Sequence, residues 1–357
     1  MLKNILLFIL CLVPLMRADD DTVKAIQHSE LPEPVSNNAV AGVTIDGTHH
    51  FFSFMGLKPG KTYKDITLQS YHMKLNEQKW ERIPPVPGQK GRLAGTAVGA
   101  GKYIYVFGGY TVAEDHSEKS IPDVDRYNPK TQKYKAMAPM PVPVDDAVSL
   151  LYKKRYIYLI SGWHDIGNVD LVQVYDIEEN RWFRATPYPG TPVFGHAGGI
   201  VNRTLIIADG VKKVWENKNK NKYSFKMSKE TYKGVIDADD TSVIHWEEIP
   251  KHPGKARYRM AAAGSKRTGM VVFAGGSETP YNYNGIGYNG QPSKPTRDIF
   301  AWNVAADRWQ HIGQMQVATM DHRGLLEADE QFFILGGMQK KQQVSNEVIA
   351  FELPSLE

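Results

Sequence analysis

Charged and polar side chains recur just before a series of segments rich in small and apolar residues. They are Asn37, Asn38, Arg92, Asp145, Asp146, His196, Arg257, Arg259, Asp321, His322 and Arg323. Arginine can hold a carboxylate or neighbouring hydroxyls through parallel hydrogen bonds, and histidine and carboxyl groups can transfer protons. If the fold brings these side chains together, they form a polar cavity for a small ligand. His196, Asp209 and Arg259 are the candidates for acid–base chemistry.

Aromatic and amide side chains gather in two loops. Residues 162–168 (GWHDIGN) contain Trp163, His164 and Asp165, and residues 278–298 contain Tyr281, Tyr283 and Tyr288 among several asparagines. An ordered loop of about twenty residues is usually functional. Flat aromatic faces stack on sugar rings and amides bind hydroxyls, so this composition is typical of a carbohydrate site. The alternative is that these tyrosines only pack their loop onto the fold.

A structural alternative also exists for the charged residues, because arginines and aspartates in a ring can simply pair with one another. Other chemistry has no support in the sequence. There is no zinc-type HExxH, no nucleophile elbow and no phosphate-binding loop. We therefore expect no metal and no cofactor.

The elements that must position these residues come from an internal repeat. A β-rich segment that ends in glycine recurs, and a later segment carries a large aromatic. The first segments are 49–56, 103–109, 156–162, 204–210, 270–276 and 332–338. The aromatics are Trp80, Tyr134, Trp182, Trp246 and Trp309. A period near 50 with four strands per unit predicts an all-β propeller.

The pattern resembles the kelch-repeat family over nearly the whole chain. Its marks are the diglycine (Gly108–Gly109, Gly275–Gly276), the tyrosine before a turn (Tyr127, Tyr175) and the tryptophan about seven residues later. In two other repeats the diglycine is replaced, by Ser161–Gly162 and by Asp209–Gly210. The resemblance implies a six-bladed kelch β-propeller. The last copy stops at its third strand, so we expect the N-terminal segment 22–34 to supply the outer strand and close the ring.

Two kinds of kelch propeller resemble this chain. Galactose oxidase-like propellers carry a copper-radical cofactor that needs a tyrosine crosslinked to a cysteine. The chain beyond residue 18 has no cysteine, so we expect no copper-radical oxidase activity. Bacterial N-acetylneuraminate epimerases are six-bladed, and the resemblance implies a glutamate and an arginine after the second strand of a middle blade. This chain reads ADGVKK there, with Val211, Lys212 and Lys213. Hemiacetal ring opening needs only a proton donor and acceptor.

The N-terminus reads as a secretory signal peptide over residues 1–18. Lys3 precedes an apolar stretch of about eleven residues, which is too short to span a bilayer. We expect a mature single-domain propeller over 19–357, located in the periplasm or secreted, with no membrane span. The only cysteine, Cys11, lies in this signal, so disulfides are excluded from the mature chain. Asn202 begins a glycosylation sequon whose use depends on the host.

The net charge of +4 is small, and basic residues are spread along the 357-residue chain. Nucleic acid is therefore not an expected partner. The sequence predicts an exported propeller whose channel mouth binds a carbohydrate or glycan, either without catalysis or with exchange of the sugar's anomers as in a mutarotase or epimerase. The alternative is a non-catalytic scaffold that binds a protein on the loop face.

Overall fold

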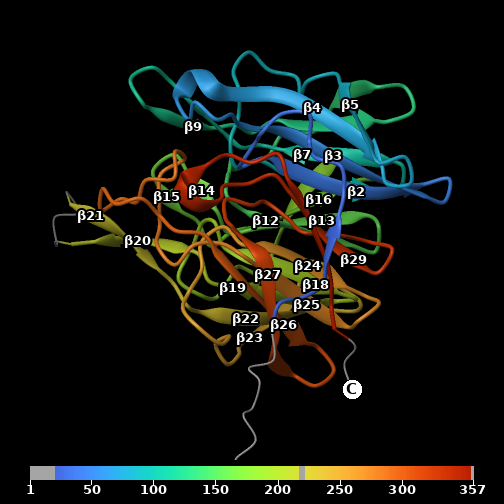
Figure 1. The fold of residues 1–357 in the computed structure, drawn as a ribbon. Coiled ribbons are helices and arrows are strands. Elements are labelled where there is room, and N and C mark those ends of the chain that lie inside the picture. Colours follow the sequence, from blue (N-terminus) through green and yellow to red (C-terminus); the bar gives the residue numbers. More distant parts are fainter. Residues whose placement is uncertain (1–20, 217–221, 355–357) are drawn as a thin grey trace, which may run out of the picture.

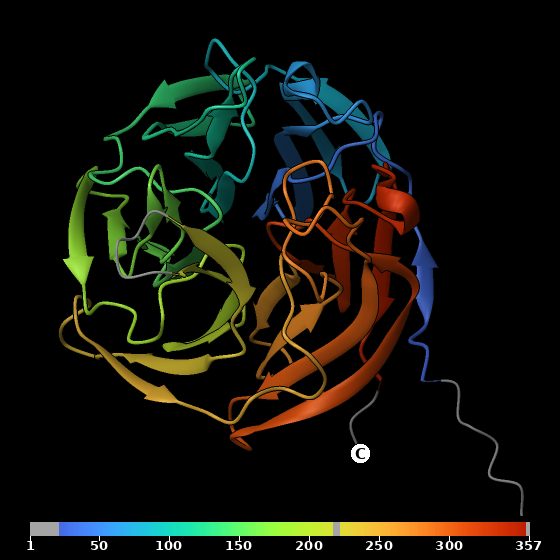
Figure 2. The same ribbon diagram turned by 90° about the vertical axis from the view of Figure 1, so that its left-hand side faces the viewer.

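Six four-stranded antiparallel sheets stand around a central axis in the part of the chain that the structure describes (Figure 2). The structure is a computed structural model, and it describes residues 21–216 and 222–354. The sheets follow one another along the chain as the blades of a propeller. The predicted six-bladed kelch architecture is confirmed.

Each blade begins with an innermost strand beside the axis and ends with an outermost strand at the rim. Blade 1 contains, in that order, β2 (Ala39–Ile45), β3 (Thr48–Leu57), β4 (Ile66–Lys74) and β5 (Lys79–Ile83). Blade 2 contains β6 (Thr96–Ala100), β7 (Tyr103–Phe107), β10 (Val124–Asn128) and β11 (Lys133–Ala136). Blade 3 contains β12 (Val148–Tyr152), β13 (Tyr156–Ile160), β16 (Val172–Asp176) and β17 (Arg181–Ala185).

The second half of the ring repeats this order. Blade 4 contains β18 (Ala197–Val201), β19 (Thr204–Ala208), β22 (Thr231–Ile236) and β23 (Ile244–Glu248). Blade 5 contains β24 (Ala261–Ser265), β25 (Met270–Ala274), β26 (Thr296–Asn303) and β27 (Arg308–Thr319). Blade 6 contains β28 (Leu326–Ala328), β29 (Gln331–Leu335), β30 (Val348–Glu352) and β1 (Ala25–Gln27).

The N-terminal strand closes the ring, as predicted. β1 pairs with β30 in antiparallel register, with Ala25 opposite Phe351 and Gln27 opposite Ile349. Leu31 follows this strand and is 1% exposed in a core cluster with Trp80 of blade 1 and Phe333 of blade 6. The N-terminal segment therefore completes the last blade and packs it against the first.

Loops after the second strands project from one end of the ring, which we call the loop face. Three of them form small hairpins, visible in part at the left of Figure 1. They are β8 (Tyr110–Val112) with β9 (Glu118–Ser120), β14 (Trp163–His164) with β15 (Gly167–Asn168), and β20 (Val211–Trp215) with β21 (Tyr223–Met227). Two short 3-10 helices lie at Tyr63–Asp65 and Lys340–Gln342. No helix in the described ranges is long and apolar enough to cross a membrane.

Aromatic side chains fill the space between neighbouring blades. Phe52 and Phe54 of blade 1 contact the ring of Tyr127 in blade 2 edge-on, with centroids 5.9 and 6.1 Å apart. Tyr127 also meets Tyr134, and the equivalent residues Tyr175 and Trp182 meet in blade 3 at 5.1 Å. Large aromatics at these two positions of the repeat therefore hold successive blades together.

Each blade places one residue with left-handed backbone next to the axis. The six residues, which we call the axial belt, are Asn37, Ala94, Asp146, Gly195, Arg259 and Asp321, and their φ angles lie between 52° and 74°. Backbone N–H groups of Asn37, Asp146, Gly195 and Arg259 donate to the carbonyl of the preceding belt member around the ring, at 2.8–3.0 Å. The N–H of Ala94 donates to Oδ1 of Asn37 at 2.9 Å, and His322 N–H donates to the Arg259 carbonyl at 3.2 Å. The belt links all six blades directly.

Candidate functional site

The axis of the propeller holds two cavities, one on each side of the axial belt. The loop-face cavity has a volume of about 920 Å³ and is lined by Asp145, Asp146 and Arg259. The strand-face cavity has a volume of about 1030 Å³ and is lined largely by innermost strands, together with His196, His322 and Arg323.

A buried ion cluster lies between the two cavities. Arg259 donates to Asp146 through Nε at 3.0 Å and Nη2 at 2.6 Å, and to Oδ1 of Asp321 through Nη1 at 2.8 Å. Arg323 also pairs with Asp146, and its Nε donates to Asn37 at 2.9 Å. Burial opposes ionisation of Asp146, but the two guanidinium groups outweigh it and hold the pKa of Asp146 below its usual range. Two arginines and two aspartates leave this cluster electrically balanced.

One wall of the loop-face cavity is aromatic. Trp163 and Phe225 have ring centroids 5.7 Å apart, and Phe225 and Tyr288 have centroids 4.2 Å apart. Phe194 contacts both Trp163 and Phe225, at 5.4 and 5.6 Å, and Tyr223 contacts Phe225 at 5.6 Å. We call these five residues the aromatic wall. They come from the inner end of blade 4 and from loops of blades 3, 4 and 5, and all line the cavity.

Carboxyl groups stand in the same cavity. Burial and the neighbouring charge of Asp146 raise the pKa of Asp145 well above its usual range, although Oδ2 of Asp145 accepts a hydrogen bond from Ser120 at 2.7 Å. Glu118 is open to the solvent in the cavity, yet the surrounding protein limits its hydration and raises its pKa to about 7. Among the described residues, neither Asp145 nor Glu118 forms an ion pair. Glu118 can therefore exchange protons near neutral pH.

The two predicted histidines face the other cavity. His196 and His322 each follow a belt residue by one position, and both line the strand-face cavity. Burial lowers the pKa of His196 to about 4, and burial with the charge of Arg323 lowers the pKa of His322 to about 3. Both histidines are neutral at physiological pH. The structure does not bring them together with the aromatic wall.

Other predicted site residues lie within or between blades and line neither central cavity. Arg92 and Arg257 each stand two positions before a belt residue. Arg92 pairs with Asp125 at 3.3 Å and Arg257 pairs with Asp298 at 2.6 Å, each on the third strand of its own blade. Neither arginine lines a central cavity because its side chain fastens the inner end of the blade to the third strand.

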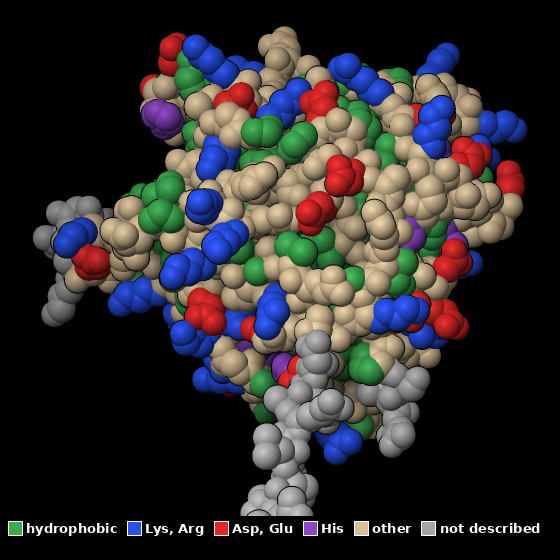
Figure 3. Space-filling view, viewed as in Figure 1, with side chains coloured by type: hydrophobic (Ala, Val, Ile, Leu, Met, Phe, Trp, Pro, Cys, Tyr) green, Lys and Arg blue, Asp and Glu red, His purple; other side chains and the backbone are tan. Residues whose placement is uncertain are grey.

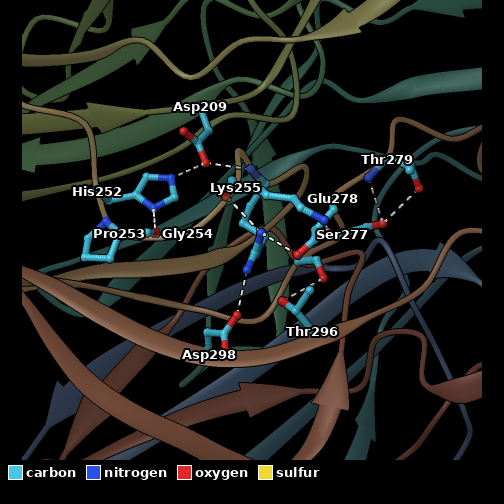
Figure 4. A network of polar contacts seen from close by, with 12 residues as sticks. Asp209, His252, Pro253, Gly254, Lys255, Ser277, Glu278, Thr279, Thr296 and Asp298 are labelled. Carbon is cyan, nitrogen blue, oxygen red and sulfur yellow. Dashed lines mark hydrogen bonds and ion pairs between the residues drawn. The ribbon is translucent and has the colours of Figure 1, made fainter.

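Asp209, a candidate for acid–base chemistry, belongs to a network at the junction of blades 4 and 5 (Figure 4). Its Oδ2 lies 2.7 Å from Nε2 of His252 and also accepts the backbone N–H of Arg257 at 2.6 Å. Burial raises the pKa of Asp209, and hydrogen bonding to His252 opposes that shift. His252 stacks on Phe300 with centroids 4.2 Å apart. This network joins blades and does not line either central cavity.

The long loop 278–298 combines packing with cavity lining. Tyr281 is fully buried, and its hydroxyl donates to Oδ1 of Asp321 at 3.4 Å. Tyr283 is 9% exposed and lines the loop-face cavity, as does the more exposed Tyr288. His164, in the other aromatic loop, contacts the carbonyl of Pro143 through Nδ1 at 2.9 Å and does not line the cavity. Tyr281 and His164 therefore pack the loops onto the fold, whereas Tyr283 and Tyr288 line the cavity.

Several cavity residues were not singled out from the sequence. They are Tyr110, His116, Glu118, Phe194, Tyr223 and Phe225. Tyr110, Glu118, Tyr223 and Phe225 belong to the hairpins that follow the second strands of blades 2 and 4. The signal for these four was positional, because the topological argument that selected Trp163 applies to the whole loop after every second strand.

Comparison with known proteins agrees with this architecture. A family profile for the kelch motif matches residues 91–141, the region of blade 2. The chain is 25% identical over 259 residues to Kelch-like protein 15 of Homo sapiens, which covers 70% of this chain and only 39% of that relative. It is 22% identical over 375 residues to N-acetylneuraminate epimerase of Salmonella arizonae, covering 91% of this chain and 89% of the relative.

A solved structure titled "Structure of YjhT" superposes with a TM-score of 0.70 at 15% sequence identity, covering 92% of this chain and 98% of the other. At that identity the match supports the fold alone. Together the motif match and the repeated blades confirm the resemblance drawn from the sequence: the protein is a six-bladed β-propeller that carries a kelch motif in blade 2. Its similarity to the epimerases extends over most of both chains.

Two sequence expectations concern other parts of the molecule. The signal peptide over residues 1–18 lies outside the described residues. On the face shown in Figure 3, basic and acidic side chains are interspersed and form no single basic block, which fits the small net charge.

Proposed function

We propose that this protein binds a carbohydrate in the loop-face cavity and exchanges its anomers. The observation that carries the proposal is the aromatic wall, which faces the same cavity as Asp145 and Glu118. An apolar wall beside hydrogen-bonding groups suits a sugar ring, which has apolar faces and polar edges. Similarity to N-acetylneuraminate epimerases over about nine-tenths of the chain supports a sugar ligand.

The proposed reaction needs one group that gives a proton to the ring oxygen and one that takes a proton from the anomeric hydroxyl. Rotation about the opened bond and reclosure then yields the other anomer, with no net change in atoms. Glu118, with its pKa raised to about 7, is suited to both roles near neutral pH. Asp145, whose pKa is raised well above its usual range by burial and by the charge of Asp146, serves as the donor partner. We also propose that the N-terminal signal exports the protein to the periplasm or the exterior.

The test is a panel of free monosaccharides examined by NMR, in which binding broadens ligand signals and anomer exchange appears as magnetisation transfer. The wild type is expected to do both with at least one sugar. Trp163→Ala should lose binding with an unchanged melting temperature, because Trp163 is part of the cavity wall and partly exposed. Glu118→Gln should bind the sugar and lose exchange. Absence of binding across the panel would refute the proposal and favour a scaffold function.

A further inference from the structure

Among the groups that line the loop-face cavity and form no ion pair, acids outnumber bases. Five carboxyl groups line the cavity, from four separate segments of the chain, and the lining bases are Arg259 and His116. The carboxyl groups are Glu118, Asp145, Asp146, Asp165 and Glu216. Arg259 is already engaged by Asp146 and Asp321, and Glu216 pairs with Lys222 at 2.9 Å.

Three carboxyl groups therefore lack a cationic partner in the described parts of the chain. Glu118 stands on β9, Asp145 on the segment before β12, and Asp165 at the turn between β14 and β15. Asp165 accepts the backbone N–H of Ser120 through Oδ1 at 2.8 Å, and Asp145 accepts the hydroxyl of the same residue. Ser120 therefore bonds to both Asp145 and Asp165. It ends strand β9, which also carries Glu118.

An ammonium group of the protein itself already contacts two rings of the aromatic wall. Nζ of Lys213 lies over the rings of Tyr223 and Trp215, 4.1 and 4.4 Å from their centroids, and 5.5 Å from that of Trp163. Lys213 does not itself line the cavity. A cation held between aromatic faces and carboxylates gains from both the ring quadrupoles and the charges.

From this arrangement we infer that the sugar is cationic: the loop-face cavity selects an amino sugar whose ammonium group lies between the aromatic wall and the carboxylates of Asp165 and Glu118. This inference rests on the proposed carbohydrate function and specifies its substrate class. A sugar carboxylate would meet the carboxylates of Asp165 and Glu118, which have its own sign, while the only lining guanidinium in the described ranges is saturated by two aspartates. The site therefore discriminates by charge against acidic sugars.

The test compares three probes on the wild-type protein by calorimetry near neutral pH: glucosamine, its uncharged analogue N-acetylglucosamine, and the anion N-acetylneuraminate. Glucosamine is expected to bind roughly ten- to a hundredfold more tightly than either of the others, because one charged contact in a partly enclosed site contributes a difference in affinity of this size. Added salt should reduce that preference. The three outcomes separate the two proposals. Tightest binding of either N-acetylglucosamine or N-acetylneuraminate overturns the charge inference and leaves the carbohydrate function standing. Binding of none of the three overturns the charge inference, and absence of binding across the whole monosaccharide panel overturns the carbohydrate function as well.

A variant pair assigns the preference to this site. Asp165→Asn removes a charge and keeps an oxygen able to accept the Ser120 N–H, so the fold should be retained. It should reduce the preference for glucosamine by about tenfold and leave N-acetylglucosamine unaffected. Glu81→Gln removes an equivalent charge from the exposed outer strand of blade 1 and should change neither. An unchanged glucosamine preference in Asp165→Asn would contradict the assignment.

Discussion

Arg259 clamps Asp146 with two hydrogen bonds across the propeller axis, from belt positions that belong to blades 5 and 3 of the ring. Both side chains are almost fully buried, at 3% and 2% exposure. Each contact therefore spans the centre of the molecule and connects blades that share no strand pairing. The pair occupies the floor of the loop-face cavity and also forms part of the ring structure.

Removing Arg259 is expected to lower the stability of the whole propeller. Arg259→Ala leaves Asp146 and Asp321 buried with fewer cationic partners, and such a loss costs about 3–5 kcal/mol. Urea unfolding followed by tryptophan fluorescence measures it. Arg181→Ala, at an exposed position on β17, is the control and should change the unfolding free energy by less than about 0.5 kcal/mol. Equal stability of both variants would show that the cluster contributes nothing.

The backbone of Gly195 is expected to tolerate no side chain. Gly195 has a φ of 59°, and an added Cβ would overlap the ring of Tyr258. Gly101 has a φ of 60°, but nothing lies within 4 Å of its added Cβ. Gly101→Ala should therefore cost only about 1–2 kcal/mol from backbone strain. Gly195→Ala should cost clearly more, because it adds a collision at the belt. A similar loss for both variants in chemical unfolding would mean that Tyr258 moves aside freely.

Closure of the ring by the N-terminal segment is expected to depend on Leu31. This side chain is 1% exposed between the first and last blades, so Leu31→Ala should destabilise the protein by about 2–5 kcal/mol. Deleting residues 22–34 should lower the melting temperature further. Ile166→Ala provides the control, because Ile166 is 80% exposed. A deletion with the wild-type melting temperature would show that β1 adds nothing to blade 6.

The stability of the protein should depend on pH through Glu118. Its pKa is about 7 in the folded protein, against an ordinary value of 4.5. Between these values the folded state keeps a proton that the unfolded state has lost, so this contribution to stability falls as pH rises through 7. Glu118→Gln removes the effect. Its unfolding free energy, relative to the wild type, should therefore increase between about pH 5 and about pH 8. Glu81→Gln should show a constant difference, and a flat profile for Glu118→Gln would refute the assigned pKa.

The repeat made the blades predictable because each mark has a local physical cause. Glycines after the second strand and aromatics on the third and fourth strands occur at fixed spacing, so the strands and the closing role of residues 22–34 followed from the sequence. The directions of the side chains next to the axis could not be predicted from the sequence. Arg257 and Arg259 are two residues apart in an irregular segment, yet the first pairs within its blade and the second reaches across the axis. His196 faces the strand side, one residue beyond the belt.

The hairpins were harder to anticipate, since their pairing is fixed by packing over the cavity. The stretch around Glu216–Lys222 reads as a solvated polar loop, but the segments beside it form β20 and β21, and Glu216 and Tyr223 reach the cavity lining. Composition alone does not show that the segments on either side pair with each other and reach the cavity.

The pairing of β1 with β30 also has a consequence for how the chain folds during synthesis. The first strand to be made pairs with the last one, so it must wait until nearly the whole chain exists before it finds its partner. Until then the blades form an open arc, and β1 has no strand to pair with. Closing so long a loop adds entropic cost, and an unpaired edge is a template for strands of other chains. The nascent protein is therefore most prone to aggregation in the interval before its two ends meet.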